Sequence, residues 1–197
     1  MIPINTLTAI QSRRSIPNFK NEDVQRNILQ AIFTYGSYAP THYMKEPWRI
    51  KLYEKKGTRK LVEAIIASYQ HLGMLKSADA DPAAQKMTDS MRRFLLKIPH
   101  HAVIYFPRET DPARYDEAYA SVCTFIQNAQ LAAWEYGVGM LWTNPPYMYD
   151  QAFYTDIGLD YKTDKIVAVM QIGYPAKIPL FKGRTPIADK MTFITEE

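Results

Sequence analysis

Apolar residues recur every three or four positions in several stretches of the chain, as expected of helices with one buried face. The stretches with this spacing are residues 4–13, 21–36, 58–69, 112–136 and 151–157, with a looser pattern over 74–97. The first helix should end near Arg13, because Pro17 prevents easy continuation. In the second, Asn21 is expected to be the N-cap, since the next two residues are acidic and suit the positive end of the helix dipole.

Four other stretches have the patterns of strands. Trp48, Ile50 and Leu52 alternate with basic residues, which predicts a strand with one buried face. Residues 102–106 form a continuous apolar run, and residues 166–172 are apolar apart from Gln171, as expected of strands buried on both faces. Residues 140–142 should lead into a further strand, because they follow the glycine-rich end of the longest predicted helix.

The tail after Pro175 is irregular and basic, and it has no core pattern of its own. Met191, Phe193 and Ile194 give it apolar anchors. Such a tail must either pack over its own domain or wrap a partner subunit.

Length and charge narrow the possible functions. A chain of 197 residues fits a single domain spanning 1–197, and Lys plus Arg exceed Asp plus Glu by only 24 − 20 = 4. This excess suits an anionic cofactor or substrate but falls far short of a nucleic-acid surface. With one cysteine, no signal segment and no apolar run approaching about 20 residues, we expect a cytoplasmic protein without a membrane span.

Two stretches carry candidate chemistry. Arg13, Arg14 and Ser15 place two guanidinium groups and a hydroxyl at a helix end, a donor set that matches phosphate oxygens, although such triplets are also common on solvated surfaces. Residues 39–48 crowd polar and aromatic groups between two prolines and read as a shaped loop.

Other motifs are not supported. The histidines at positions 42, 71, 100 and 101 have no standard metal-ligand spacing, so no metal site is expected. Gly137-x-Gly139 follows a helix, whereas a dinucleotide fingerprint must follow a strand. The sequence has no phosphate-binding lysine loop, no nucleophile elbow and no distinctive acid–base pair. No catalytic side chain is therefore assigned, and a cofactor would have to carry any reaction.

Five segments, in order, together resemble the FMN-dependent nitroreductase family, flavoenzymes that pass electrons from NAD(P)H to nitroaromatics, quinones and related acceptors. The first two, Arg13-Arg14-Ser15 and the loop from Ala39-Pro40-Thr41 to Pro47-Trp48, resemble the family's phosphate motif and its proline-bounded loop. The other three are the alanine-rich helix that leads into Gly137-Val138-Gly139, then Ile172-Gly173-Tyr174-Pro175, and last Arg184-Thr185-Pro186-Ile187.

The resemblance implies roles for twelve residues. It assigns to the phosphate and ribityl end of FMN the residues Arg13, Arg14, Ser15, Arg184 and Lys182. It sets beside the flavin, in a cleft formed with a second subunit, Pro40, Thr41, His42 and Met44. It brings to the face and edge of the flavin ring the segment Trp142, Thr143 and Asn144.

Two departures from the family pattern affect the flavin ring. Many family members have a Lys or Arg two positions after the motif serine, but this chain has Pro17 there. The reduced ring is anionic at that edge, so another donor must stabilise it or its potential is lowered. Met44 and Glu46 also stand where the family usually has Asn and Gln.

The implied fold class is α+β, a mixed, largely antiparallel sheet flanked by helices. The implied assembly is a homodimer with FMN at the interface, in which the tail (residues 176–197) docks on the partner. The implied reaction is ping-pong hydride transfer from NADPH or NADH to a small-molecule acceptor.

Two alternatives stay open. One is a specialised flavin enzyme of the same superfamily, either a dehalogenase or a flavin reductase. The other is a non-catalytic module that binds nucleotides or single strands, suggested by the basic tail and 14 Tyr, 8 Phe and 3 Trp. Against the second, those aromatic residues are spread through the core patterns.

Overall fold

The computed structural model describes residues 5–195, so the predicted helical position of Ile4 lies outside the described residues. Most of the expected elements are present, at bounds close to those expected. The elements in chain order are α1 (Thr6–Ser12), α2 (Arg26–Gly36), the 3-10 turn η1 (His42–Met44), β1 (Arg49–Glu54), α3 (Lys56–His71), α4 (Pro82–Leu96), β2 (His100–Pro107), α5 (Pro112–Glu135), β3 (Gly139–Thr143), η2 (Pro146–Tyr149), α6 (Gln151–Asp156), β4 (Asp164–Gly173) and η3 (Ile187–Lys190).

The strands form one sheet in the order β1-β2-β4-β3, and each neighbouring pair is antiparallel. The expectation of a mixed sheet was wrong for these strands. The parallel pairing in the described part of the chain is a single bridge between Ser15 and Met140. Pro17 has no backbone N–H, so the segment after Ser15 cannot extend this bridge into a further strand.

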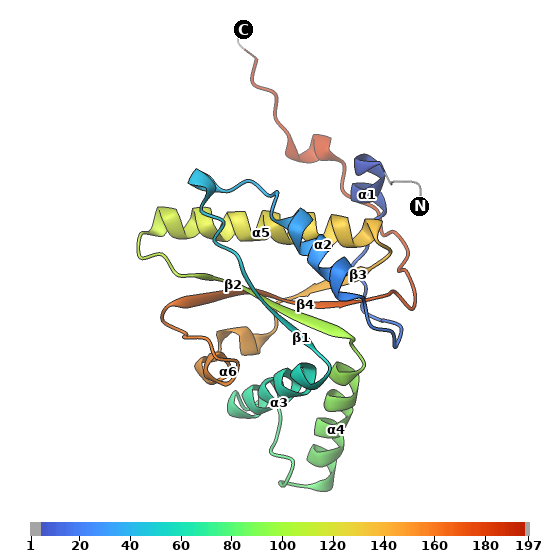
Figure 1. Ribbon diagram of the computed structural model, residues 1–197, viewed down its shortest axis with the longest axis vertical. Helices are drawn as coiled ribbons and strands as arrows, with labels where there is room; N and C mark the ends of the chain where they lie inside the picture. Colours follow the sequence, from blue (N-terminus) through green and yellow to red (C-terminus); the bar gives the residue numbers. More distant parts are fainter. Residues whose placement is uncertain (1–4, 196–197) are drawn as a thin grey trace.

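Helices cover both faces of the sheet, which confirms the α+β class (Figure 1). Helices α2 and α5 lie on one face and bury Trp48 and Phe125 against the central strands. Helices α3, α4 and α6 lie on the other face, where Ile65 and Phe153 are buried. Strand β2 touches both cores through alternate residues, and this is why its apolar run is continuous.

Strand β1 differs from its prediction. Trp48 is buried just before it, but Leu52 is 37% exposed, so the expected buried face is incomplete. The reason is position, since β1 is an edge strand with β2 as its one neighbour in the sheet. An edge strand is covered less completely than a central one.

Two helices begin later than the sequence indicated. Asn21 is not an N-cap, because α2 begins at Arg26 after an extended segment. That segment is held by the buried N–H of Val24, which donates to Nε2 of His100 at 2.9 Å, a contact across 76 positions that the local pattern could not show. Helix α4 begins at Pro82, where Asp81 caps it, so residues 74–80 are not helical.

The longest helix, α5, lies across one sheet face against β2, β3 and β4 and organises the site described below (Figure 1). Asp111 caps its start by accepting from the N–H of Arg114. Its end turns at Gly137, whose φ of 68° is left-handed and favours glycine. This turn leads directly into β3.

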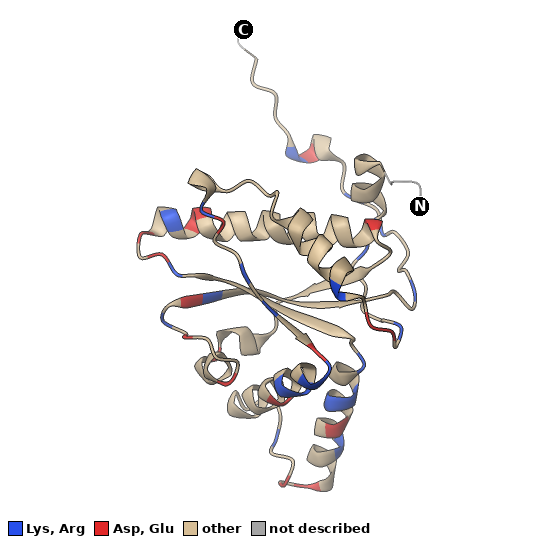
Figure 2. Ribbon diagram, viewed as in Figure 1, with Lys and Arg blue, Asp and Glu red and all other residues tan. Residues whose placement is uncertain are grey.

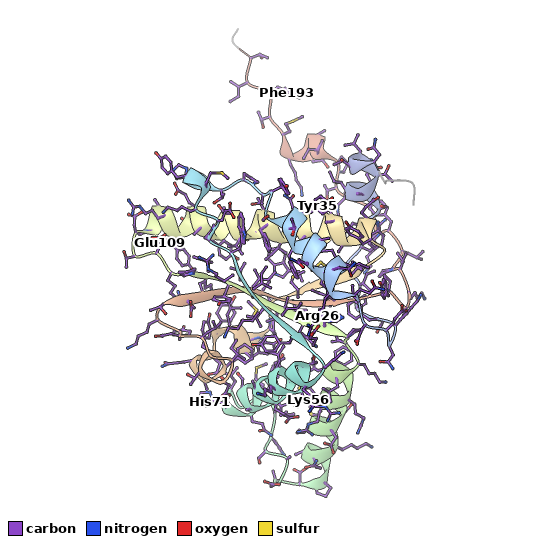
Figure 3. All side chains as sticks on the ribbon, viewed as in Figure 1. Arg26, Tyr35, Lys56, His71, Glu109 and Phe193 are labelled. Atoms are coloured by element: carbon purple, nitrogen blue, oxygen red, sulfur yellow. The ribbon has the colours of Figure 1, made fainter. Side chains whose placement is uncertain are left out.

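The C-terminal tail leaves the body of the molecule (Figure 1). Its apolar side chains are not buried: Leu180 is 89% exposed, Phe193 79% and Ile194 95%. Phe193 is labelled on this projecting segment in Figure 3. Of the two expectations for the tail, packing over its own domain is therefore not observed along most of its length.

Candidate functional site

Three arginines from the two ends of the chain meet at one cavity. The cavity has a volume of about 590 Å³ and is lined by Ile10, Gln11, Arg13, Arg14, Phe181 and Arg184. We call it the arginine cavity. Helix α1 ends at Ser12, where the chain turns into an extended conformation at Arg13, and both Arg13 and Arg14 line the cavity. The structure thus brings Arg13 and Arg14 of the first motif together with Arg184, as the sequence indicated.

The electrostatics of the arginine cavity favour an anion. Burial, together with the positive charges of Arg184 and Arg14, lowers the pKa of Arg13. Its Nε atom is buried without a hydrogen-bond partner, and its Nη1 atom makes one long hydrogen bond of 3.4 Å to Oε1 of Gln130. A buried guanidinium with an unused donor is costly unless an acceptor arrives. The residues present therefore fit a phosphate group.

Arg14 is held by the tail and by its own helix end. Its guanidinium lies 4.8 Å from the centre of the Phe181 ring, and Nη1 donates to the backbone oxygens of Gln11 and Arg13. A cation above an aromatic face is attracted by the ring. Phe181 thereby joins a residue of the tail to the N-terminal motif.

Strand β3 lies against the same motif. The N–H of Ile16 donates to the oxygen of Met140 at 3.1 Å. This approach needs Gly139, because a Cβ atom there would lie 2.6 Å from Cγ1 of Ile16. Trp142 lies two positions after Met140 on β3, and Asn144 follows the end of the strand. The predicted phosphate and ring segments are therefore neighbours in one chain.

Side chains at the end of β3 are fixed by internal hydrogen bonds. The hydroxyl of Thr143 donates to the oxygen of Val169 at 2.6 Å, and Asn144 Oδ1 accepts from the hydroxyl of Tyr149 at 3.2 Å. Trp142 is partly buried against the core that α5 covers. These bonds engage the hydroxyl of Thr143 and the amide oxygen of Asn144 within the chain.

The loop of residues 40–46 is strained and exposed. Tyr43, Met44 and Glu46 have φ of 48°, 54° and 45°, in the left-handed region that costs non-glycine residues roughly 1 kcal/mol each. Tyr43 is 85% exposed and Met44 75%. Inside the loop, Thr41 Oγ1 accepts from the N–H of Glu46 at 3.1 Å. Strain on an exposed loop of this kind is typical of functional segments.

The loop and the arginine cavity do not meet within one chain. His42 Nε2 lies 3.8 Å from Oε1 of Glu117 near the start of α5, whereas Arg13 contacts Gln130 near its end. At about 1.5 Å of rise per residue, these two positions on α5 are roughly 20 Å apart. Figure 1 shows the same separation, with η1 at one end of α5 and α1 at the other. The predicted site is divided into two halves.

Some predicted residues stand apart and some contributors were missed. Ser15 and Lys182 are exposed and do not line the arginine cavity, and Pro40 is exposed on the distant loop. Phe181 and Gln130 were missed. The available signal for Gln130 was an amide in the buried stripe of α5, where it is only 6% exposed. Phe181 stood within the basic tail, but nothing local showed that it would face Arg14.

Within residues 5–195, no helix is long and apolar enough to cross a membrane. Over the same residues, no group of three or more His, Cys, Asp and Glu side chains could hold a metal ion.

Comparison with known proteins agrees with this geometry. The model of the nitroreductase family matches residues 10–174. YfhC of Bacillus subtilis (strain 168), named as a candidate NAD(P)H nitroreductase, is 32% identical over 93% of this chain and 91% of its own length. Iodotyrosine deiodinase of Hydra vulgaris is 25% identical over 93% of this chain and 70% of its own length.

Solved structures share the fold. A nitroreductase-like protein from Bacillus cereus has a TM-score of 0.88 at 32% identity, covering 100% of this chain and 99% of its own. The FMN-dependent nitroreductase NfnB from Mycobacterium smegmatis, solved in complex with NADPH, has a TM-score of 0.69 at 17% identity, covering 95% and 96%.

The fold is that of a nitroreductase-like α+β protein. With a family model that covers most of its length, this chain belongs to the nitroreductase family, and it is an enzyme of that family.

Proposed function

We propose that this protein is an FMN-dependent oxidoreductase that uses NADPH or NADH to reduce small acceptors such as nitroaromatics or quinones. One observation carries the proposal: Arg13, Arg14 and Arg184 surround a cavity of about 590 Å³, and the buried Nε of Arg13 has no partner. Bound FMN would supply the redox chemistry, taking up hydride from the nicotinamide and passing electrons to the acceptor. The proteins that resemble this chain support the choice, since NfnB is FMN-dependent and was solved with NADPH.

The role of this chain's own residues would be to bind FMN and to position it. Arg13, Arg14 and Arg184 hold the phosphate through charge-assisted hydrogen bonds. The backbone at Trp142–Asn144 would line the ring, and the loop containing Thr41, His42 and Met44 would cover the ring bound by a partner chain. None of these side chains has to act as an acid or a base, which agrees with the absence of an acid–base pair in the motifs.

We propose further that the enzyme is a homodimer in which each site takes its two halves from different chains. The roughly 20 Å between the loop and the arginine cavity along α5 supports this, because each chain's own loop is held at the far end of the helix by Glu117, so a partner's loop would have to cover the flavin. The exposed apolar side chains of the tail also support it, because Leu180, Phe193 and Ile194 would be buried against a partner.

A binding titration tests the cofactor. Purified protein should show the visible absorption of bound flavin or should take up one added FMN per chain. Arg184→Ala should weaken FMN binding by about tenfold, because one charge-assisted contact is lost. Lys182→Ala is the matched control, because this substitution removes the same charge from the tail at a residue that does not line the cavity. No flavin spectrum and no uptake of FMN would refute the proposal.

A dehalogenase is the second candidate, favoured by the similarity to iodotyrosine deiodinase over 93% of this chain. Steady-state turnover separates the candidates. Nitroaromatics and quinones should be reduced at the expense of NADPH or NADH. Release of halide from a halogenated phenol, with no turnover of the other acceptors, would instead favour the dehalogenase, and rapid reduction of free flavin would favour a flavin reductase.

A further inference from the structure

A second basic cavity lies on the opposite side of the sheet from the arginine cavity. It has a volume of about 680 Å³ and is lined by Asn21, Asp23, Lys55, Lys56, Thr58, Arg59, Leu96, Lys97, Ile98 and Pro99. We call it the α3 cavity, because the first turn of α3 forms one wall. Figure 2 shows Lys and Arg gathered at the start of α3 and along α4, while α1 and the tail lie beyond the other sheet face.

The charges of the α3 cavity are unbalanced. Four cations line it, Lys55, Lys56, Arg59 and Lys97, against the single carboxylate of Asp23. None of the four forms an ion pair with another described residue. The nearby carboxylate of Glu54 is already bound by Arg26. An anion in this cavity would meet positive charge on several sides.

The start of α3 adds backbone donors to these cations. The helix is 16 residues long, and no side chain caps its N-terminus. The first N–H groups of a helix have no partner within the helix, and the dipole favours negative charge there. In α4 and α5, by contrast, the side chains of Asp81 and Asp111 fill this position.

An independent observation at the same place is the side chain of Thr58. Thr58 is only 4% exposed and lines the cavity, yet its hydroxyl has no hydrogen-bond partner among the described residues. A buried hydroxyl without a partner costs free energy, which an arriving acceptor would recover. The unpartnered hydroxyl and the uncapped turn belong to the same wall.

We propose that the α3 cavity binds the phosphoryl group of a small phosphate ester. Lys55, Lys56, Arg59 and Lys97 supply the charge, and Thr58 and the first turn of α3 supply neutral donors. The volume fits a molecule of nucleotide size better than a lone phosphate ion. Leu96, Ile98 and Pro99 provide an apolar wall for the rest of such a molecule.

Calorimetric titration with inorganic phosphate and with adenosine monophosphate tests the proposal. The protein is first saturated with FMN, so that the arginine cavity cannot take up the probe. We expect saturable binding at one site per chain, weakened by higher salt. Tighter binding of adenosine monophosphate than of phosphate identifies an ester as the ligand, and equal binding identifies the phosphoryl group alone. Absence of saturable binding of either probe overturns the proposal.

Charge-reversal variants locate the site. Lys56→Glu with Arg59→Glu should weaken binding by at least about tenfold, because two charge-assisted contacts become repulsive. The matched control is Lys60→Glu with Lys86→Glu, which changes the net charge equally at exposed positions outside the cavity. Equal loss in both variants would show non-specific attraction and overturn the proposal. Because these variants leave the arginine cavity intact, the result stands whether or not FMN binds there.

Thr58→Val tests the buried hydroxyl. It replaces an unpartnered hydroxyl with a methyl group of similar shape, so the free energy of unfolding should be unchanged or higher. Binding of the probe should be about threefold weaker, because one neutral hydrogen bond is lost. Binding equal to that of the wild type would overturn the placement of the anion at the start of α3.

Discussion

The arginine cavity and the loop of residues 40–46 lie at opposite ends of α5 and are built in opposite ways. At the arginine cavity, the cost is electrostatic: like charges converge and the buried Nε of Arg13 lacks a partner. In the loop, the cost is conformational: three residues hold left-handed backbone while their side chains remain largely exposed. A ligand phosphate would offset the electrostatic cost at the arginine cavity, and contact with a rigid partner surface would offset the conformational cost in the loop. The arginine cavity is therefore suited to an anionic ligand, and the loop is suited to contact with another protein surface.

The largest effect is expected from removing Arg13, which should change FMN binding and stability in opposite directions. Arg13→Ala should weaken FMN binding by about 100-fold, because a bidentate charge-assisted contact is lost. The FMN-free protein should be as stable as the wild type or more stable, because the substitution also relieves repulsion from Arg14 and Arg184. FMN titration and chemical unfolding measure the two effects.

Arg93→Ala is the control for Arg13→Ala, since Arg93 is exposed on α4 and far from either half-site. It should change neither quantity. A loss of stability in Arg13→Ala without a loss of FMN affinity would mean that Arg13 is structural, and the arginine cavity would then not be a phosphate site.

The next largest effect concerns the contact between β3 and the N-terminal motif. Gly139→Ala would place a methyl group 2.6 Å from Ile16, so the segment holding the arginines must shift. We expect the free energy of unfolding to fall by about 2 kcal/mol and FMN binding to weaken as well. Gly57→Ala, where a new Cβ meets nothing closer than 3.9 Å, should preserve both, and an unchanged Gly139→Ala protein would refute the close approach.

The stability of the sheet has its own pH dependence, through the buried side chain of His101 on β2. Burial lowers the pKa of His101 to about 4, against about 6.5 in the unfolded chain. The unfolded state therefore binds more protons between these values, so stability is present above pH 6.5 and is lost as the pH falls toward 4. Between pH 6.5 and 5 the loss should be about 1.5 kcal/mol.

Unfolding curves at several pH values measure this slope for the wild type and for His101→Gln. The variant should lose much of the slope, and a slope equal to that of the wild type would contradict the assignment to His101. The arginine cavity and the loop are accordingly best compared above about pH 7.5, where the titration of His101 no longer changes the stability.

The smallest effect is expected in the loop. Tyr43→Gly removes the penalty of left-handed backbone at φ 48° and should raise the free energy of unfolding by roughly 0.5 kcal/mol. FMN affinity should change little, but KM for the acceptor should rise if the loop covers the ring of the partner's site. Tyr38→Gly, at another exposed tyrosine outside the left-handed region, should not be stabilised.

Much of this arrangement could be predicted from the sequence because its signals are local. Burial could be predicted from the apolar runs of β2 and β4 and from the apolar stripe on α5. The preference for an anion could be predicted from Arg13 and Arg14. The start of α2 could not be predicted, because the N–H of Val24 is held by His100, 76 positions away. The contact of Phe181 with Arg14 and the isolated parallel bridge at Ser15 likewise depend on tertiary packing.

The separation of the loop from the arginine cavity could not be predicted from the sequence pattern either. Nothing at Thr41 or His42 indicates that α5 holds them roughly 20 Å from Arg13, because that separation follows from the docking of the loop against Glu117. The family resemblance named residues 13–15 and 39–48 as parts of one site, but the distance between them follows only from the fold.

Sedimentation velocity of the FMN-loaded protein, followed at the visible flavin absorption band, tests the central claim most directly. We predict that flavin sediments with a species of twice the mass of one chain, at one flavin per chain. Flavin that stays unbound, or that sediments with a single chain, would contradict a flavin site assembled from the two halves.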